Sequence, residues 1–314
     1  MFLGIEIGGT KLQLGLGAGD GVIVKLWRGT VDPAQGGEGI RRQILVAFPE
    51  LLASAGVSKS DLKGIGVGFG GPTDDDTQTV ITSHQIVGWD GFPLAAWLTD
   101  LLGLPTVICN DADVAGLAEA LFGAGKGLSP IFYITVGTGI GGGLIINGEI
   151  YRGVGRGAAE IGHTFVAAPA GTESGGRTRV EPWASGRGIE THARVLHLAA
   201  KGKAGGAPPT LSTQDIVRAA NAGDEQASRV LKDAVQVLAE GILQVITLLC
   251  PKRVVIGGGV SMIGEDLFFQ PIRDHVEQQW FAPFRGLTDI VPAALGEEVV
   301  VHGALALARK KLGA

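Results

Sequence analysis

Cysteine and net positive charge are both scarce in this sequence, and each scarcity excludes a class of protein. Only Cys109 and Cys250 occur among the 314 residues, which excludes a disulfide framework and a cysteine-rich zinc site. The 26 Lys and Arg residues are outnumbered by 31 Asp and Glu residues, so the formal net charge is −5. That balance gives no support to a nucleic-acid-binding surface. The N-terminus has no basic segment ahead of its apolar run, so no signal peptide is indicated.

Long uninterrupted apolar segments are also absent. The longest apolar stretch covers residues 235–250 and contains Gln236, Glu240 and Gln244. Their spacing of four residues draws a single polar stripe along a helix, which is typical of a core helix and not of a membrane span. We therefore expect a soluble, cytoplasmic protein without a membrane partner.

Glycine, in contrast, is abundant, with 52 residues, and it clusters after short apolar runs. This placement predicts tight turns and close backbone approaches. Two stretches match the pattern G-x-G-x-x-G, at residues 66–71 and 137–142. Neither of them opens a helix, whereas a dinucleotide-binding fingerprint needs a strand, a turn and a helix in that order. No G-x-x-x-x-G-K-[ST] pattern occurs either, so a P-loop is excluded.

The order of the predicted elements indicates an α/β protein with two similar lobes. Strands at 2–7, 12–16 and 22–27 form a first meander. A second set begins with strands at 131–136 and 143–146 and a hairpin turn at Asn147-Gly148. Helices are predicted at 39–55, 94–102, 111–122, 187–200, 213–221, 224–249 and at the C-terminus. Ligands of such paired lobes usually bind in the cleft between them.

A glycine-containing turn lies at the same point of each repeat. Glycine allows backbone N–H groups to approach an anion closely, and a threonine hydroxyl or a lysine adds a further donor. Either turn alone is typical of an ordinary β-turn. Because the two occur at matching positions, we favour a two-sided phosphate clamp made by Gly8, Gly9, Thr10 and Lys11 and by Gly137, Thr138 and Gly139.

Six motifs, taken together and in this order, resemble the ROK family of sugar kinases over essentially the whole chain. They are EIGGTK (6–11), CNDADVAGLAE (109–119), TVGTGIGGGLIINGEIYRG (135–153), AAEIGH (158–163), EPWASG (181–186) and VVIGGGV (254–260). The resemblance implies an α/β fold of the actin-like ATPase type, with two ribonuclease-H-like lobes and an active-site cleft between them. It implies an N-terminal lobe at 1–112, a C-terminal lobe at 113–298, and a C-terminal helix at about 299–314 that packs back on the N-terminal lobe.

The resemblance also implies roles for individual residues. Asp111 would accept the proton of the attacking sugar hydroxyl. The alternative is that Asp111 serves only as the N-cap of the helix that follows. The sugar would be bound by Asn110, Asp111, Glu160, His163, Glu181 and Gly71. Taken alone, His163 would be a structural histidine.

ATP is the phosphoryl donor that the resemblance implies. The two glycine turns would hold its phosphates, and Gly257, Gly258 and Gly259 would let the adenosine lie flat on the backbone. Mg²⁺ would accompany ATP and keep most of its waters, with Glu6 as its candidate protein ligand. The acidic run 74–76 is expected to be a solvated turn, because three successive side chains do not converge on one ion.

Three departures from the family pattern bear on these expectations. Glu6 stands where the family usually has Asp, which bears on metal placement. Glu173, Gly175 and Arg179 stand where many members have zinc-binding cysteines, so we predict no structural zinc. The segment 83–94 keeps the family's Gly-Trp pair but has His-Gln in place of Asn-Leu. This segment lies near the sugar in the family, so the departure does not decide which sugar is the substrate.

The sequence therefore predicts an ATP-dependent hexose kinase that converts glucose to glucose 6-phosphate, acting as a homodimer without a nucleic-acid partner. Fructose, mannose, N-acetylmannosamine and N-acetylglucosamine remain alternative substrates. A sugar-responsive repressor of the same family would carry a helix-turn-helix ahead of the first phosphate turn, for which residues 1–5 leave no room. Another alternative is a sugar-binding homologue without catalytic activity. Only the replacement of the family Asp by Glu6 supports it, and the presence of Asp111 argues against it.

Overall fold

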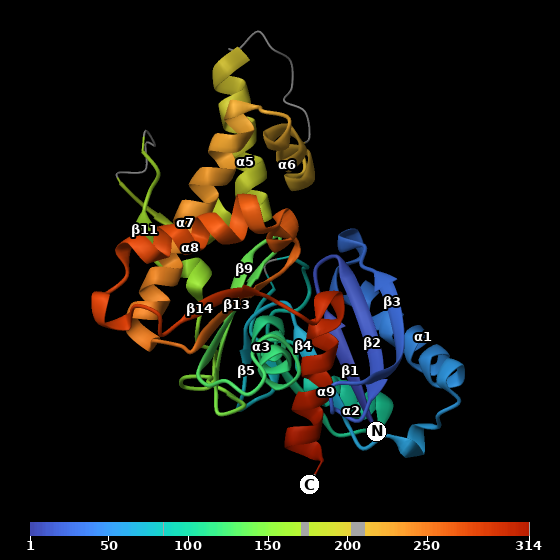
Figure 1. The fold of residues 1–314 in the computed structure, drawn as a ribbon. Helices are drawn as coiled ribbons and strands as arrows, with labels where there is room; N and C mark the ends of the chain where they lie inside the picture. The colour runs from blue at the N-terminus through green and yellow to red at the C-terminus, as the bar shows by residue number, and fades with distance from the viewer. Residues whose placement is uncertain (84, 171–175, 202–210, 314) are drawn as a thin grey trace. The chain divides into compact units, whose positions relative to one another are not determined.

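The computed structural model describes residues 1–83, 85–170, 176–201 and 211–313 (Figure 1). These residues form two compact units. The first comprises Met1–Tyr133, Gly143–Ala158 and Ala293–Ala314, and the second comprises Ile134–Gly142 and Ala159–Pro292. The expected lobe boundary after residue 112 falls in the first turn of helix α3 (Asp111–Leu121), and the whole of this helix belongs to the first unit.

A five-stranded sheet organises the first unit, in the order β3-β2-β1-β4-β7. Strands β1, β2 and β3 form an antiparallel meander, and β4 and β7 continue the sheet in parallel with β1. All six residues of β1 and all five of β4 are buried, as expected for strands that are covered on both faces. The strand bounds are Phe2–Ile7 (β1), Lys11–Gly17 (β2), Ile23–Thr30 (β3), Ile65–Phe69 (β4) and Thr106–Asn110 (β7).

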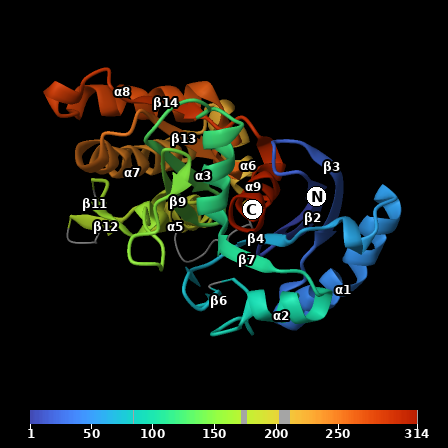
Figure 2. The same cartoon turned by 90° about the horizontal axis from the view of Figure 1, so that it is seen from below.

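Helices cover the two faces of this sheet (Figure 2). Helices α1 (Gly36–Ala55) and α2 (Leu94–Leu102) pack on one face, where Leu3, Ile5 and Ile7 enter the main core. Helices α3 (Asp111–Leu121) and α9 (Val299–Leu312) cover the other face. Glycine makes this second contact possible, because a side chain at Gly4 would lie 3.0 Å from the carbonyl oxygen of Val301 in α9.

A second five-stranded sheet has the order β10-β9-β8-β13-β14. Its strands are β8 (Ile131–Val136), β9 (Ile140–Ile146), β10 (Glu149–Ile150), β13 (Arg253–Gly257) and β14 (Asp289–Pro292). Strands β9 and β10 pair antiparallel, and β13 and β14 pair in parallel. This order repeats that of the first sheet, with three consecutive strands followed by two from further along the chain, so the predicted repeat is confirmed.

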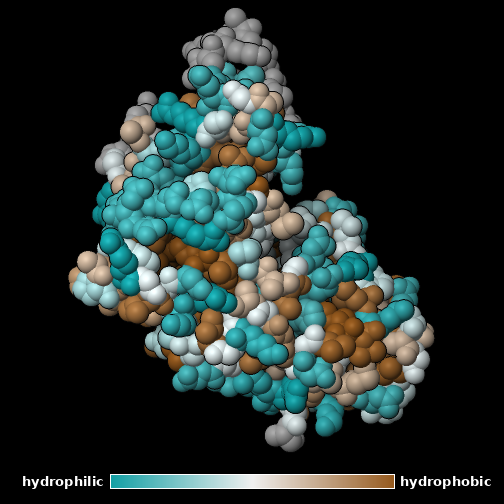
Figure 3. All heavy atoms as spheres, viewed as in Figure 1, coloured by the Kyte–Doolittle hydropathy of each residue, from teal (hydrophilic) through white to brown (hydrophobic). Residues whose placement is uncertain are grey.

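The helices of the second unit are α4 (Glu181–Ala184), α5 (Gly186–Lys201), α6 (Thr213–Asn221), α7 (Glu225–Leu249) and α8 (Gln270–Gln279). Helix α7 confirms the prediction made for residues 235–250. Most of its apolar residues, including Val237, Leu238 and Ile242, are buried, while Gln236 is exposed; Leu248 and Leu249 at its C-terminal end are also exposed. None of the helices in the described part of the chain is long and apolar enough to cross a membrane. On the face seen in Figure 3, hydrophilic side chains predominate, with smaller hydrophobic patches among them.

Several short elements were not predicted. Strand β14 is one, and the segment between β10 and α5 contains the hairpin β11 (Phe165–Ala167) and β12 (Arg177–Arg179) as well as α4. The segment after β4 forms a small hairpin of β5 (Thr73–Asp74) and β6 (Thr79–Val80). All of these elements are four residues or shorter, too short for a hydrophobic period to be recognised.

Candidate active site

The segment Asn110-Asp111 lies where β7 ends and α3 begins. Asn110 is the N-cap of α3, because its Oδ1 accepts hydrogen bonds from the backbone N–H groups of Ala112 (2.9 Å) and Asp113 (3.3 Å). Asp111 is the first helical residue, and its Oδ1 accepts from Ala112 N at 2.8 Å. The alternative in which Asp111 serves only as the N-cap is therefore wrong, since Asn110 has that role.

The Asp111 carboxylate lies beside the first glycine turn. A Cβ placed on Gly70, at the end of β4, would be 3.5 Å from Asp111 Oδ2 and 3.6 Å from the Cα of Gly8. The side-chain amide of Asn110 donates to the carbonyl oxygen of Gly71 at 3.1 Å. The ends of β1, β4 and β7 thus bring the first glycine turn, Gly71 and Asn110-Asp111 to one edge of the first sheet.

Glu6 is the buried carboxylate of this edge. It lies in β1, is only 5 % exposed, and its Oε1 accepts from Lys11 Nζ at 2.9 Å. Lys11 Nζ also donates to the carbonyl oxygen of Glu297 at 3.0 Å. The second carboxylate oxygen, Oε2, receives no hydrogen bond from the described residues. Burial raises the pKa of Glu6 to about 7, against the opposing effect of Lys11.

The first glycine turn has a neighbour that sequence reasoning did not identify. The exposed side-chain amide of Gln85 lies directly over Gly9, so a Cβ on Gly9 would overlap Gln85 Oε1. The sequence signal for Gln85 was the departure from the family pattern in segment 83–94. His84, the other residue of that departure, lies outside the described residues.

The second glycine turn joins β8 to β9 and is held by Glu181. The Oε2 atom of Glu181 accepts from Ile140 N at 2.7 Å, and a Cβ on Gly139 would lie 2.7 Å from the same oxygen. Gly137 N donates to Gly139 O at 2.9 Å, and Gly137 O accepts from Gly186 N at 2.8 Å. Glycine at position 139 therefore allows the Glu181 carboxylate to lie against the turn.

Glu160 is the N-cap of the short 3₁₀ helix Ile161–His163, and His163 is the last residue of that helix. Ala159, which precedes them, has a φ of +64°, an uncommon conformation for a residue with a side chain and one that often occurs at functional sites. Its carbonyl oxygen accepts from Ile161 N at 2.7 Å, which makes a tight turn around Glu160. His163 is exposed, and its Nδ1 lies 3.5 Å from Arg179 Nη1.

The third glycine turn follows β13. Gly258 has a φ of +88°, and a Cβ there would lie 2.5 Å from the carbonyl oxygen of Val136 at the end of β8. Gly259 has no neighbouring atom within 4 Å of the position that a Cβ would take. The turn Gly257–Gly259 thus lies against the strand end that leads into the second glycine turn.

Each unit therefore gathers its own share of the expected residues. The first unit brings together Glu6, Gly8, Gly9, Thr10, Lys11, Gly71, Asn110 and Asp111. The second brings together Gly137, Thr138, Gly139, Glu160, His163, Glu181, Gly257, Gly258 and Gly259.

The structure describes only part of the segment in which many family members have zinc-binding cysteines. Glu173 and Gly175 lie outside the described residues, whereas Arg179 lies in β12 and contacts His163. Within the ranges that the structure covers, no three His, Cys, Asp or Glu side chains are grouped so as to hold a metal ion.

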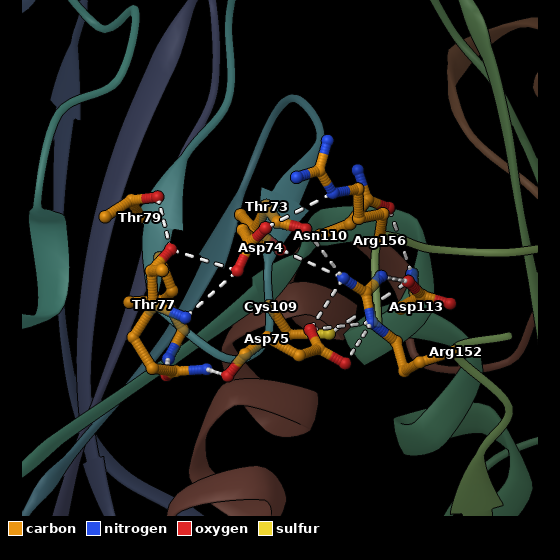
Figure 4. Close-up of polar contacts among 12 residues, drawn as sticks. Thr73, Asp74, Asp75, Thr77, Thr79, Cys109, Asn110, Asp113, Arg152 and Arg156 are labelled. Atoms are coloured by element: carbon orange, nitrogen blue, oxygen red, sulfur yellow. Dashed lines mark hydrogen bonds and ion pairs between the residues drawn. The ribbon is translucent and has the colours of Figure 1, made fainter. Parts of the chain in front are cut away.

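The acidic run 74–76 forms a turn, but the expectation that it is simply solvated is wrong for two of its residues. Asp74 accepts from Thr77 N at 3.0 Å and pairs with Arg156 Nε at 3.3 Å. Asp75 pairs with Arg152 Nη2 at 2.8 Å (Figure 4). Sequence reasoning did not identify the two arginines, because they lie in a glycine-rich loop without any period.

Comparisons with known proteins agree with this geometry. A model of the ROK family matches residues 2–311. A glucokinase of Halalkalibacterium halodurans is 34 % identical over 311 residues, which cover 96 % of this chain and 93 % of the relative. The crystal structure of a ROK hexokinase from Thermus thermophilus superposes with a TM-score of 0.81 at 28 % identity, covering 99 % of both chains.

A second solved structure is informative about ligands. It is a ROK family glucokinase from Streptomyces griseus in complex with glucose and AMPPNP, with a TM-score of 0.78, 30 % identity, and coverage of 98 % of this chain and 99 % of the other. The fold, the site residues and these matches define a sugar-kinase-type α/β protein. The chain belongs to the ROK family.

Proposed function

We propose that the chain is an ATP-dependent hexose kinase that transfers the γ-phosphoryl group of ATP to the 6-hydroxyl of glucose. The observation that carries the proposal is the placement of Asp111 beside the first glycine turn, with Asn110 taking the N-cap role. Relatives named glucokinase and a family structure holding glucose and AMPPNP support the choice of substrates.

In this proposal Asp111 accepts the proton of the sugar hydroxyl as the oxygen attacks the phosphoryl group. A carboxylate within hydrogen-bond reach both orients the hydroxyl and receives its proton. Asn110, Glu160, His163, Glu181 and the backbone of Gly71 bind the other hydroxyls. A sugar presents many donors and acceptors that must all be paired when they leave water, and carboxylates, an amide and an imidazole meet that need.

The backbone of the glycine turns binds the nucleotide. Gly8, Gly9, Thr10 and Lys11 contact the phosphates, and so do Gly137, Thr138 and Gly139. Gly257, Gly258 and Gly259 receive the adenosine. Backbone N–H groups in such turns form anion-binding concavities, and the absence of side chains allows close approach.

A divalent cation fits the residues near Glu6. The buried Oε2 of Glu6 accepts no hydrogen bond from the described residues, and a carboxylate oxygen is the ligand type that Mg²⁺ prefers. Mg²⁺ held there with ATP would neutralise phosphate charge. Cation binding would also draw Glu6 into its ionised form. Absence of structural zinc, assembly as a homodimer and a cytoplasmic location remain predictions.

Initial rates of ADP formation with glucose, mannose, fructose, N-acetylmannosamine and N-acetylglucosamine test the proposal. We expect the highest kcat/KM with glucose, and glucose 6-phosphate as the product. A preparation purified in the same way from cells that do not express the protein serves as the control for contaminating kinases. If no sugar supports ADP formation above that control, the proposed function is wrong, and a clear preference for another sugar would overturn the substrate alone.

A further inference from the structure

Arg152 lies at the centre of a buried polar network in the first unit (Figure 4). It follows β10, and its side chain is 11 % exposed. Its Nε donates to both carboxylate oxygens of Asp75 (3.0 and 3.1 Å), and its Nη2 donates to Asp75 Oδ1 (2.8 Å) and to Thr73 O (3.0 Å). Its Nη1 donates to Asp113 Oδ2. One guanidinium therefore joins the β5 segment to helix α3.

The α3 side of this network lies close to the proposed catalytic residue. Asp113 is in the first turn of α3, its side chain is 2 % exposed, and it is two residues from Asp111. The thiol of Cys109 lies against the same carboxylate, with Sγ 4.0 Å from Asp113 Oδ2. A buried carboxylate requires a charged partner with good hydrogen-bond geometry. Arg152 provides that partner and so fixes the first turn of the helix.

The β5 side of the network leads to the sugar-binding segment. Thr73 is fully buried and lies two residues after Gly71. The Gly71 carbonyl oxygen accepts from Asn110 Nδ2, and the neighbouring Gly70 lies against Asp111. Both ends of the Arg152 network are thus attached to segments that meet at Asn110-Asp111.

We propose that Arg152 is a positioning residue for the kinase reaction: by joining Thr73–Asp75 to Asp113, it holds Gly71, Asn110 and Asp111 in the geometry that proton transfer requires. This inference rests on the proposed function. Arginine suits the role because its planar fork donates to two carboxylates and a carbonyl at once, whereas a lysine ammonium is a single point charge. Among the described residues, the side-chain hydrogen bonds of Arg152 go to Thr73, Asp75 and Asp113 and not to the nucleotide-binding turns of the proposal.

Arg152→Met removes the guanidinium and keeps an apolar stem. We expect kcat to fall about ten- to hundredfold, the size of effect that small displacements of reacting groups produce, while KM for ATP stays close to that of the parent. Glucose binding measured by calorimetry should retain a stoichiometry near that of the parent, which separates misplacement from a loss of folded protein.

Arg156→Met is the matched control. Arg156 lies on the same loop and pairs with the neighbouring Asp74, but its side chain is 70 % exposed, and no hydrogen bond to α3 is found for it among the described residues. The formal charge changes by the same amount in both variants. We expect Arg156→Met to keep the parent kcat.

The double variant Arg152→Met/Asp113→Asn covers the case in which Arg152→Met does not fold. It removes the buried carboxylate that would lose its cation, but it still lacks the link to Thr73–Asp75, so we expect kcat to stay low. A kcat equal to that of the parent in either folded variant would overturn the inference. Loss of glucose binding in both variants would also overturn it, because Arg152 would then contribute only to stability. If the parent enzyme phosphorylates no sugar, both the proposed function and this inference are wrong. If the parent is active, the kcat and the glucose binding of the variants test this inference independently of the proposed function.

Discussion

The buried carboxyl group of Glu6 makes the stability of the protein depend on pH, and Glu6→Gln should remove that dependence. Burial raises the pKa of Glu6 from 4.5 to about 7 in the folded protein. Between these two values the unfolded chain has released the proton while the folded protein retains it, so stability falls as pH rises. A difference of about 2.5 pKa units at about 1.36 kcal/mol per unit corresponds to about 3 kcal/mol.

The assay is urea denaturation at pH 5 and at pH 8, in the absence of divalent cations. Other groups titrate in both proteins, so the difference between the two pH changes isolates Glu6. We expect the parent to lose about 3 kcal/mol more of its free energy of unfolding than Glu6→Gln between these pH values. Glu277→Gln is the control, because Glu277 is exposed, and it should behave as the parent does. Equal pH dependence in the parent and in Glu6→Gln would refute the burial argument.

Two further predictions concern the glycine turns and zinc. Gly258→Ala introduces a side chain at a φ of +88° and 2.5 Å from Val136 O, so it should destabilise the protein by about 1–3 kcal/mol and raise KM for ATP. Gly259→Ala, whose Cβ meets no atom within 4 Å, should leave the melting temperature unchanged; equal losses of stability in the two variants would contradict the close-approach argument. Metal analysis of the purified protein should find no stoichiometric zinc, and a chelator should leave the melting temperature unchanged. A tightly held equivalent of zinc would show that the segment 163–181 has been misread.

The sequence allowed the repeated architecture to be predicted, because its signals are local. Apolar runs that end in glycine indicate β1 and β8, and the spacing of Gln236, Glu240 and Gln244 indicates that α7 is a helix. The repeat of a meander followed by parallel strands appears in the order of both sheets. Strand β14 and the hairpin of β11 and β12 gave no such signal, because each strand is too short to show a hydrophobic period.

The candidate site could be predicted as a set of motifs but not as a set of contacts. From the sequence alone, Asp111 is a candidate N-cap of helix α3, but Asn110 is an equally good N-cap residue, and the backbone geometry shows that Asn110 has this role. The network of Arg152 joins residues that are 77 and 39 positions apart. Only the buried position of Asp113 indicates that a cation must reach it, and burial is a property of the fold.

The central claim is that Asp111 accepts the proton of the sugar hydroxyl, and the turnover of Asp111→Asn with glucose tests it most directly. The variant retains the size of the side chain and one acceptor oxygen but removes the base. We expect kcat to fall by about 10²–10⁴-fold, while the dissociation constant for glucose, measured by calorimetry on the same preparation, remains close to that of the parent. Turnover near that of the parent, with glucose bound normally, would contradict the role of Asp111.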